Sequence, residues 1–235
     1  MTLAWAAVVV AVGALAQSIS GIGFALVSGP LLFTVFGARE GVRVAVVLSM
    51  LVNVGVLARE HRVVMVRRVL PVAIAALAAT PILVAALSSA NSTALRAAAG
   101  AVIVIGAALA AAGRTRDFGT LGGVVAGLIS ATMNVLASAG GPAVAVYAAG
   151  AGWEVTRLRA TLQAYFLALN VVTLLTLGRP SWSAGRAIAL IGALLVGSVA
   201  GGVVAPRVST RLARTVTLLL AAAGGLAVLI SALAA

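Results

Sequence analysis

The chain has 235 residues, of which 63% are hydrophobic and only 9% are charged, and its mean hydropathy is +1.22. A water-soluble domain of this size could not bury so much apolar surface, so the composition predicts an all-α polytopic protein embedded in a lipid bilayer. The formal net charge of +12 comes from 16 arginines spread between the apolar segments, a pattern typical of membrane topology signals that argues against nucleic acid as a partner.

Eight apolar segments follow one another along the chain, separated by short charged or turn-rich connectors. The first begins within MTLAWAAVVV, which lacks the basic region of a signal peptide and which we therefore expect to be mature protein. No connector is long enough for a soluble domain, so we expect one multi-pass membrane domain, 1–235, in the cell (inner) membrane. The segments are roughly 3–36, 41–58, 69–88, 94–112, 118–149, 160–177, 186–205 and 213–234.

Two of these segments, 3–36 and 118–149, are too long for one straight membrane span. A helix over 3–36 would measure about 51 Å at about 1.5 Å per residue, whereas the hydrocarbon core is about 30 Å thick. Each segment also contains a Gly/Ser/Pro cluster, SISGIGFALVSGPLL with Pro30 in the first and ASAGGPAV with Pro142 in the second. We therefore predict that both segments are broken near these motifs, with Pro30 and Pro142 as structural breaks. If the chain turns back at the break, the segment is re-entrant.

The two halves of the chain match each other at a nearly constant spacing. The matched pairs are Pro30 with Pro142, Asn53 with Asn170, and Ser92-Thr93 with Ser209-Thr210, at offsets of 112, 117 and 117 residues. Such spacing is typical of an internal structural duplication. We predict one repeat over about 1–113 and a second over about 118–235, with chance matching in Ala/Val/Leu-rich sequence as the alternative.

Arginine positions favour one membrane topology over another. If all eight segments span, the arginines divide eight against eight. If the first and fifth segments are re-entrant, they divide 11 against 5. The positive-inside rule then predicts both termini outside and the 59–68 loop in the cytoplasm. An odd number of true spans in each half makes the two repeats inverted, each with a broken or re-entrant first helix and three transmembrane helices. The 11 arginines are Arg59, Arg62, Arg67, Arg68, Arg114, Arg116, Arg157, Arg159, Arg207, Arg211 and Arg214.

Several motifs resemble one family of membrane proteins. GIGFALVSGPLL in the first half, and GLISATMNVLASAGGPAVAVY followed by RLRATLQAYFLALNVVTLL in the second, resemble the TauE/SafE family (TSUP, sulfite exporter-like) over nearly the whole chain. The first motif departs from the family pattern, because Phe24 and Ala25 follow Gly23 where the family commonly has three consecutive glycines. The resemblance implies transport of small organic or inorganic anions, such as sulfite or sulfonates.

Residues that support acid–base or metal chemistry are scarce. The chain has no cysteine, and its carboxylates Glu40, Glu60, Asp117 and Glu154, like the single His61, all lie in connectors. Proton relays, metal clusters and catalytic acid–base pairs need such groups together at depth. We therefore expect neither an enzyme nor a cofactor or metal site.

The breaks themselves are the first candidate binding elements. Glycine lets a ligand approach the backbone closely, and the unpaired N–H groups at a helix N-terminus attract anions. We hypothesise two facing anion-binding turns near the bilayer midplane; the alternative is that the small residues only permit close helix packing. The candidate residues are Ser20, Gly21, Gly23, Ser28, Gly29, Ser138, Gly140 and Gly141.

Polar side chains near the breaks form the second group of candidates. Gln163 and Asn170 are seven residues apart on one helix face, and Asn53, four residues after Ser49, lies on the matching helix of the other half. Amide N–H₂ groups can donate to an oxyanion, although interhelical hydrogen bonding explains such residues equally well. The remaining candidates are Gln17 and Asn134, which flank the breaks, and Arg159, which either attracts anions or snorkels to headgroups.

These expectations combine into a membrane exporter of small anions, with the lipid bilayer and the anion as its partners. An exporter of a neutral or zwitterionic metabolite and a membrane scaffold without a substrate remain as alternatives. A homo-oligomer is compatible with the sequence, which leaves open the substrate, the direction of transport, the coupling ion and the path of the two long segments.

Overall fold

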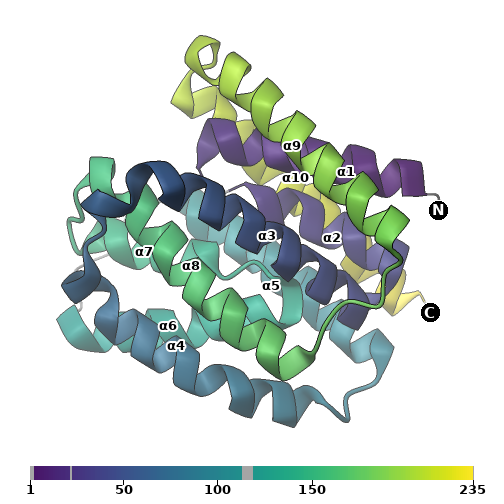
Figure 1. Ribbon diagram of the computed structural model, residues 1–235. Helices are drawn as coiled ribbons and strands as arrows, with labels where there is room; N and C mark the ends of the chain where they lie inside the picture. The colour runs from purple at the N-terminus through teal and green to yellow at the C-terminus, as the bar shows by residue number, and fades with distance from the viewer. Residues whose placement is uncertain (1–2, 22, 113–118, 235) are drawn as a thin grey trace.

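The computed structural model describes residues 3–21, 23–112 and 119–234 and is helical almost throughout (Figure 1). Short 3₁₀ turns lie between α3 and α4 (η1, His61–Val63) and between α9 and α10 (η2, Ala205–Arg207). The described part contains no strand. The helices are α1 (Leu3–Ser20), α2 (Phe24–Phe36), α3 (Ala38–Glu60), α4 (Val66–Leu87), α5 (Ser92–Ala112), α6 (Gly119–Ala137), α7 (Gly141–Gly150), α8 (Val155–Leu177), α9 (Ala184–Val204) and α10 (Thr210–Leu233).

Both over-long segments are interrupted, which confirms that part of the prediction. The first is divided between α1 and α2, and the second between α6 and α7. One residue in each interruption has a left-handed backbone, Gly21 with φ 81° and Ser138 with φ 54°. A positive φ ends a helix because the chain can no longer continue in the right-handed direction.

The prolines do not have the same role in the two breaks. Pro142 stands in the first turn of α7, where its missing N–H costs no hydrogen bond. Pro30, in contrast, lies inside α2, as the seventh residue of that helix, and does not mark the break. The first interruption comes from Gly21 and Gly23 instead, and the Pro30 ring faces Gly224 of α10.

Each interrupted segment folds back on itself as a helical hairpin. In the first, the Ser28 hydroxyl of α2 donates to the Val9 carbonyl of α1 at 3.3 Å. In the second, the Tyr147 hydroxyl of α7 donates to the Gly119 carbonyl at the start of α6, also at 3.3 Å. Residues 19 and 28 positions apart meet in this way only if the second arm runs back along the first.

Helix pairs from opposite halves of the chain build the bundle. α3 packs along α8, α5 along α10, α1 along α9, and α4 along α6 (Figure 1). Glycines permit the closest approaches: a Cβ atom at Gly197 of α9 would lie 2.1 Å from the Ala11 carbonyl oxygen of α1, and one at Gly127 of α6 would lie 2.3 Å from that of Val72 of α4. Small residues at such contacts let backbones meet where lipid provides no hydrophobic driving force.

Seven helices in the described part are long and apolar enough to cross a membrane, so the chain is a multi-pass membrane protein. They are α3, α4, α5, α6, α8, α9 and α10, whereas α1 and α2 are shorter apolar helices. Because α6 alone has the length of a span, length does not decide the path of the second hairpin. The re-entrant arrangement therefore stays a prediction.

Arginine side chains make polar contacts at the two ends of the bundle. At one end, which we name the Arg39 end, Arg39 donates to carbonyls of residues 87–90 and Arg43 donates to Leu177. At the other, the Arg159 end, Arg159 lies 3.8 Å from Glu60. The start of α1 and the finish of α10 both lie at the Arg39 end (Figure 1).

Candidate functional site

A small cavity of about 50 Å³ lies where the two helix breaks meet the α3–α8 pair. Apolar residues such as Phe24 and Phe166 form part of its wall. Most of the polar candidates from the sequence also line it, together with Ser49. The candidates in the lining are Gln17, Asn53, Asn134, Ser138, Gly140, Gly141, Gln163 and Asn170.

The remaining candidates, Ser20 aside, are not in the lining, and of these Gly21 and Gly23 lie in the break between α1 and α2. Ser28 and Gly29 are inside α2, where Ser28 bonds to α1 and a Cβ at Gly29 would lie 3.0 Å from the Ala137 carbonyl oxygen. Arg159 pairs with Glu60 at the Arg159 end and is 42% exposed. Ser28, Gly29 and Arg159 were candidates because they lie in or beside a motif. In the structure their positions on the helices direct them away from the cavity. The side chain of Ser20 lies outside the described residues.

Gln17 closes the first break and caps α2. Its Nε2 donates to the Gly21 carbonyl at 2.8 Å, and its Oε1 accepts the Phe24 N–H at 3.0 Å. Gly21 also accepts a longer bond, of 3.3 Å, from Gln163 Nε2. Both functional atoms of the Gln17 amide are therefore used within the hairpin, and one N–H at the N-terminus of α2 is already satisfied.

The second break is held from outside the cavity. The Ser130 hydroxyl donates to the Gly140 carbonyl at 2.8 Å, and the Tyr165 hydroxyl donates to Ser130 at 2.8 Å. Neither Ser130 nor Tyr165 was among the candidates, since nothing in the sequence distinguishes them from other interior residues. No side chain caps α7, and its N-cap residue Gly140 and first residue Gly141 line the cavity. The N-terminal N–H groups of α7 thus remain available to a ligand.

Asn134 fastens the end of α6 to α8. Its Nδ2 donates to Asn170 Oδ1 at 3.1 Å and to the Thr173 hydroxyl at 3.0 Å, and all three residues are buried. Asn170 therefore uses its oxygen in an interhelical bond and keeps its N–H₂ group for other partners. The interhelical bond that the sequence offered as one alternative is therefore present, and the ligand-donor role of the N–H₂ group stays a prediction.

Four buried polar atoms in the cavity lining have no hydrogen-bond partner. They are Ser49 Oγ, Asn53 Nδ2, Ser138 Oγ and Gln163 Oε1. Their residues are between 2% and 8% exposed, and an unsatisfied buried polar group costs about 1–3 kcal/mol. Three of the four atoms are donors. Such a cluster is most easily explained by a ligand or water that accepts hydrogen bonds.

The cavity lining contains no ionisable residue, because every side chain in it is apolar or a neutral amide or hydroxyl. Among the described residues, no group of three or more histidines, cysteines or carboxylates is placed to hold a metal ion. The site can therefore offer hydrogen-bond donors and the positive end of the α7 dipole to an anion.

Comparison with known proteins identifies a family. The family model described as sulfite exporter TauE/SafE matches residues 5–228, nearly the whole chain. No curated protein and no solved structure matches. The matched region contains both hairpins and every residue of the cavity lining. The chain therefore belongs to the TauE/SafE sulfite exporter family of membrane transporters.

Proposed function

We propose that this protein exports a small oxyanion, with sulfite as the type, by binding it in the central cavity. The observation that carries the proposal is the set of unpartnered donors, Ser49, Asn53 and Ser138, beside the uncapped N-terminus of α7. An oxyanion presents only acceptors, and burying it is tolerable where donors replace its lost water. The N–H₂ group of Asn170 adds a further donor from α8.

The volume of the cavity favours a small substrate. About 50 Å³ corresponds to roughly four water-sized positions of about 10–15 Å³ each. Sulfite, with one sulfur and three oxygens, is of that size, whereas a sulfonate with a long organic group would need the cavity to widen. Because the lining is neutral, the anion keeps its charge in transit. A membrane potential, negative inside, then favours export by about 2.3 kcal/mol per charge per 100 mV.

One observation favours a second candidate substrate. Gln163 Oε1 is an unpartnered acceptor among the donors. An acceptor suits an anion that carries a proton, such as hydrogensulfite, or a zwitterion with an ammonium group, such as a short aminosulfonate. Measuring the affinity of the purified protein for sulfite and for an aminosulfonate distinguishes an anionic from a zwitterionic substrate.

The binding proposal is tested by two buried serines in different settings. We expect Ser49→Ala to weaken sulfite binding by about tenfold to a hundredfold, the scale of a hydrogen bond to a charged group. The melting temperature without ligand should not fall, because the lost hydroxyl has no partner in the protein. Calorimetric titration of the purified protein with sulfite measures the first effect, and a thermal melt measures the second.

Ser28→Ala is the matched control, because it removes an equally buried hydroxyl that bonds to Val9 outside the cavity. We expect this variant to lose stability and to keep its affinity for sulfite. Equal sulfite affinity in the Ser49 and Ser28 variants would refute the donor role of Ser49. Failure of the unmodified protein to bind any oxyanion would refute the proposed function itself.

We further propose that the two halves are inverted repeats. α3 and α8 have equal lengths, and α8 begins and ends 117 residues after α3 does. The same offset of 117 residues relates Gln17 to Asn134 and Phe24 to Gly141. Packing partners exchange in the same way, since α1 lies against α9 and α6 against α4. A pseudo-two-fold axis between α3 and α8 explains both regularities. The earlier pairing of Pro30 with Pro142, at 112 residues, does not fit this register.

The same arrangement leads us to propose two re-entrant hairpins, with both termini outside and η1 in the cytoplasm. We expect a cysteine introduced at His61 to react with a membrane-impermeant maleimide only after the cells are permeabilised. Ser89→Cys, in the exposed α4–α5 connection at the opposite end, should react in intact cells. The chain has no native cysteine to interfere. Labelling of residue 61 in intact cells would show that the orientation is the opposite of the one proposed.

A further inference from the structure

A second cavity, of about 210 Å³, lies at the Arg39 end of the bundle. We name it the vestibule. It is enclosed by the beginning of α3, the ends of α4, α6 and α8, and Leu95 of α5. Its wall is mainly apolar, but Arg39 and Arg43 both line it. It is about four times as large as the central cavity and, unlike that cavity, has cationic side chains in its wall.

The vestibule and the central cavity follow the same groove between α3 and α8. On α3, Val42 lines the vestibule and Ser49, seven residues later, lines the central cavity; on α8, Leu177 and Asn170 have the same spacing. Seven residues are two helical turns, so each pair shares a face and is separated by about 10 Å along the axis. The two cavities are therefore consecutive positions on one path.

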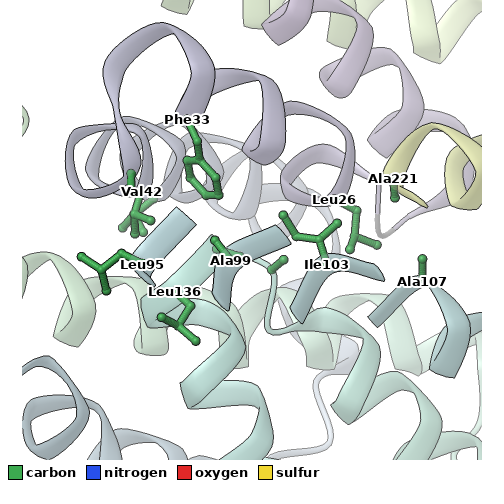
Figure 2. Packing of buried hydrophobic residues seen from close by; sticks show 13 residues of the cluster. Leu26, Phe33, Val42, Leu95, Ala99, Ile103, Ala107, Leu136 and Ala221 are labelled. Atoms are coloured by element: carbon green, nitrogen blue, oxygen red, sulfur yellow. The ribbon is translucent and has the colours of Figure 1, made fainter. Parts of the chain in front are cut away.

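A thin layer of buried residues separates the two cavities. Val46 of α3 lies between Val42 and Ser49 on the same face and is fully buried, as is Thr173 of α8. Leu136 of α6 lines the vestibule, while Ser138, two residues later, lines the central cavity. Figure 2 shows Leu136 close to Leu95 and Val42 in the same apolar cluster. The Thr173 hydroxyl accepts a hydrogen bond from Asn134, so the contact that joins α6 to α8 also lies in this layer.

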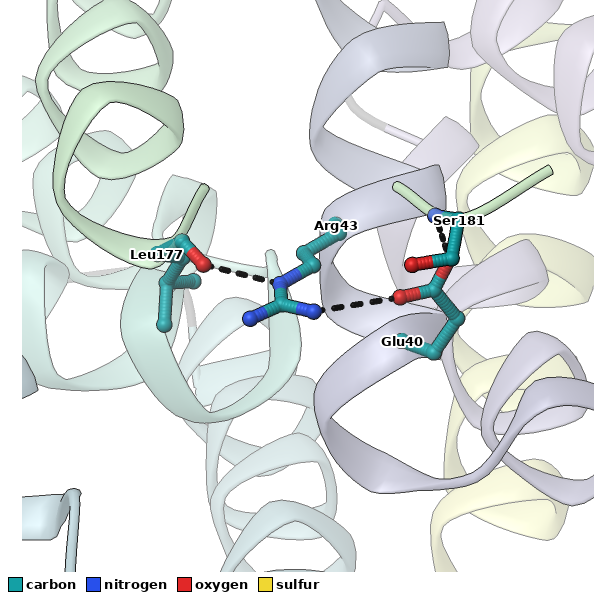
Figure 3. A network of polar contacts seen from close by, with 4 residues as sticks. All are labelled: Glu40, Arg43, Leu177 and Ser181. Carbon is teal, nitrogen blue, oxygen red and sulfur yellow. Dashed lines mark hydrogen bonds and ion pairs between the residues drawn. The ribbon is translucent and has the colours of Figure 1, made fainter. Parts of the chain in front are cut away.

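The arginines of the vestibule are held by carbonyls rather than fully neutralised. Arg43 donates to the Leu177 carbonyl at 2.8 Å and pairs with Glu40 at 3.3 Å, and Glu40 also accepts the Ser181 N–H (Figure 3). Arg39 bonds to carbonyls at the end of α4, and no carboxylate of the described residues pairs with it. These two cations and one carboxylate sum to one positive charge beside an apolar wall.

We infer that the vestibule is a second anion site, in which Arg39 and Arg43 hold the substrate, still partly hydrated, before or after it crosses the layer to the central cavity. This inference rests on the proposed function. The division of roles follows from the two linings. The larger, cationic vestibule concentrates anions with some of their water, and the smaller, neutral cavity replaces that water with fixed donors.

The test removes the two charges and follows transport. In proteoliposomes with sulfite as the probe, we expect the double variant Arg39→Gln/Arg43→Gln to raise KM at least about tenfold and to leave kcat within about twofold, because local anion concentration falls but the central site is intact. The difference from the unmodified protein should shrink between low salt and about 0.15 M salt, where charges more than about 8 Å apart are screened.

Two further double variants complete the experiment. Arg59→Gln/Arg62→Gln removes two exposed charges at the opposite end of α3 and should leave KM unchanged. Arg39→Lys/Arg43→Lys keeps the charges and should restore a low KM. Equal KM values for the two glutamine variants, or a lysine variant as impaired as the glutamine variant, would overturn the vestibule site. Absence of sulfite transport by the unmodified protein would instead refute the proposed function.

Discussion

Asn170→Asp is expected to abolish anion binding while the protein stays folded. Asn170 Oδ1 accepts the bond from Asn134, and an aspartate keeps that acceptor, so the link between α6 and α8 survives. The N–H₂ group, however, becomes a second carboxylate oxygen facing the cavity. Two like charges about 4 Å apart repel by about 4 kcal/mol at an effective dielectric constant of about 20, which corresponds to about a thousandfold loss of affinity. Calorimetric titration with sulfite and a thermal melt measure the two effects.

Asn134→Asp is the matched comparison, because it makes the same change one hydrogen bond away. Asn134 acts as the donor to both Asn170 and Thr173, so an aspartate there faces the Asn170 oxygen with another acceptor. We expect this variant to melt at a distinctly lower temperature, since breaking a buried pair costs more than never forming it. If Asn170→Asp lost stability and its folded fraction bound sulfite normally, Asn170 would be excluded from the site.

Gly197→Ala is expected to cause the largest loss of stability of any single added methyl group in the described part. Its Cβ would lie 2.1 Å from the Ala11 carbonyl oxygen, and this neighbour is backbone that cannot rotate away. α9 must therefore move from α1, which opens the interface along its whole length. Overpacking typically costs about 1–3 kcal/mol, and we expect a value at the upper end of this range. Thermal melting in detergent measures the change.

Gly192→Ala, on the same helix, provides the control. A Cβ at Gly192 meets no atom within 4 Å, and alanine favours helix over glycine by about 1 kcal/mol. This variant should therefore match or exceed the unmodified protein in melting temperature. Gly127→Ala, at the close contact between α6 and α4, should behave like Gly197→Ala, because its Cβ would lie 2.3 Å from the Val72 carbonyl oxygen. Identical melts for the alanine variants at Gly192 and Gly197 would contradict the close packing of α1 and α9.

The break at 21–23 illustrates how far the sequence could be interpreted. Segment length predicted an interruption, and both interruptions are present. The first was expected near the Gly/Ser/Pro motif of residues 18–32, with Pro30 as a structural break. Proline inside α2 is nevertheless accommodated, while the turn depends on the left-handed backbone of Gly21. A glycine pair within an apolar run was the better signal, and the equivalent position, Ser138, shows that even a serine can adopt this conformation.

The candidate site shows a similar limit. Asn53, Gln163 and Asn170 were identified from helical spacing, and all three line the cavity. Spacing could not distinguish Gln17, whose amide is used in capping α2, from Asn53, whose N–H₂ group has no partner. Arg159 was favoured because of its motif, yet its charge is directed to Glu60 at the surface. Residue type and periodicity identify polar groups in the interior but not the partners that satisfy them.

The sequence by itself determined that this is a helical membrane protein, where its apolar segments lie, that two of them are broken, and which family its motifs resemble. These properties follow from composition, segment length and local backbone preference, all of which are local along the chain. Only the tertiary structure decided that each broken segment forms a hairpin, that the breaks meet beside α3 and α8, and which donors line the cavity. The physical reason is that hydrogen-bond satisfaction depends on distances between residues far apart in sequence, such as Asn134 and Thr173, and these distances are fixed by packing.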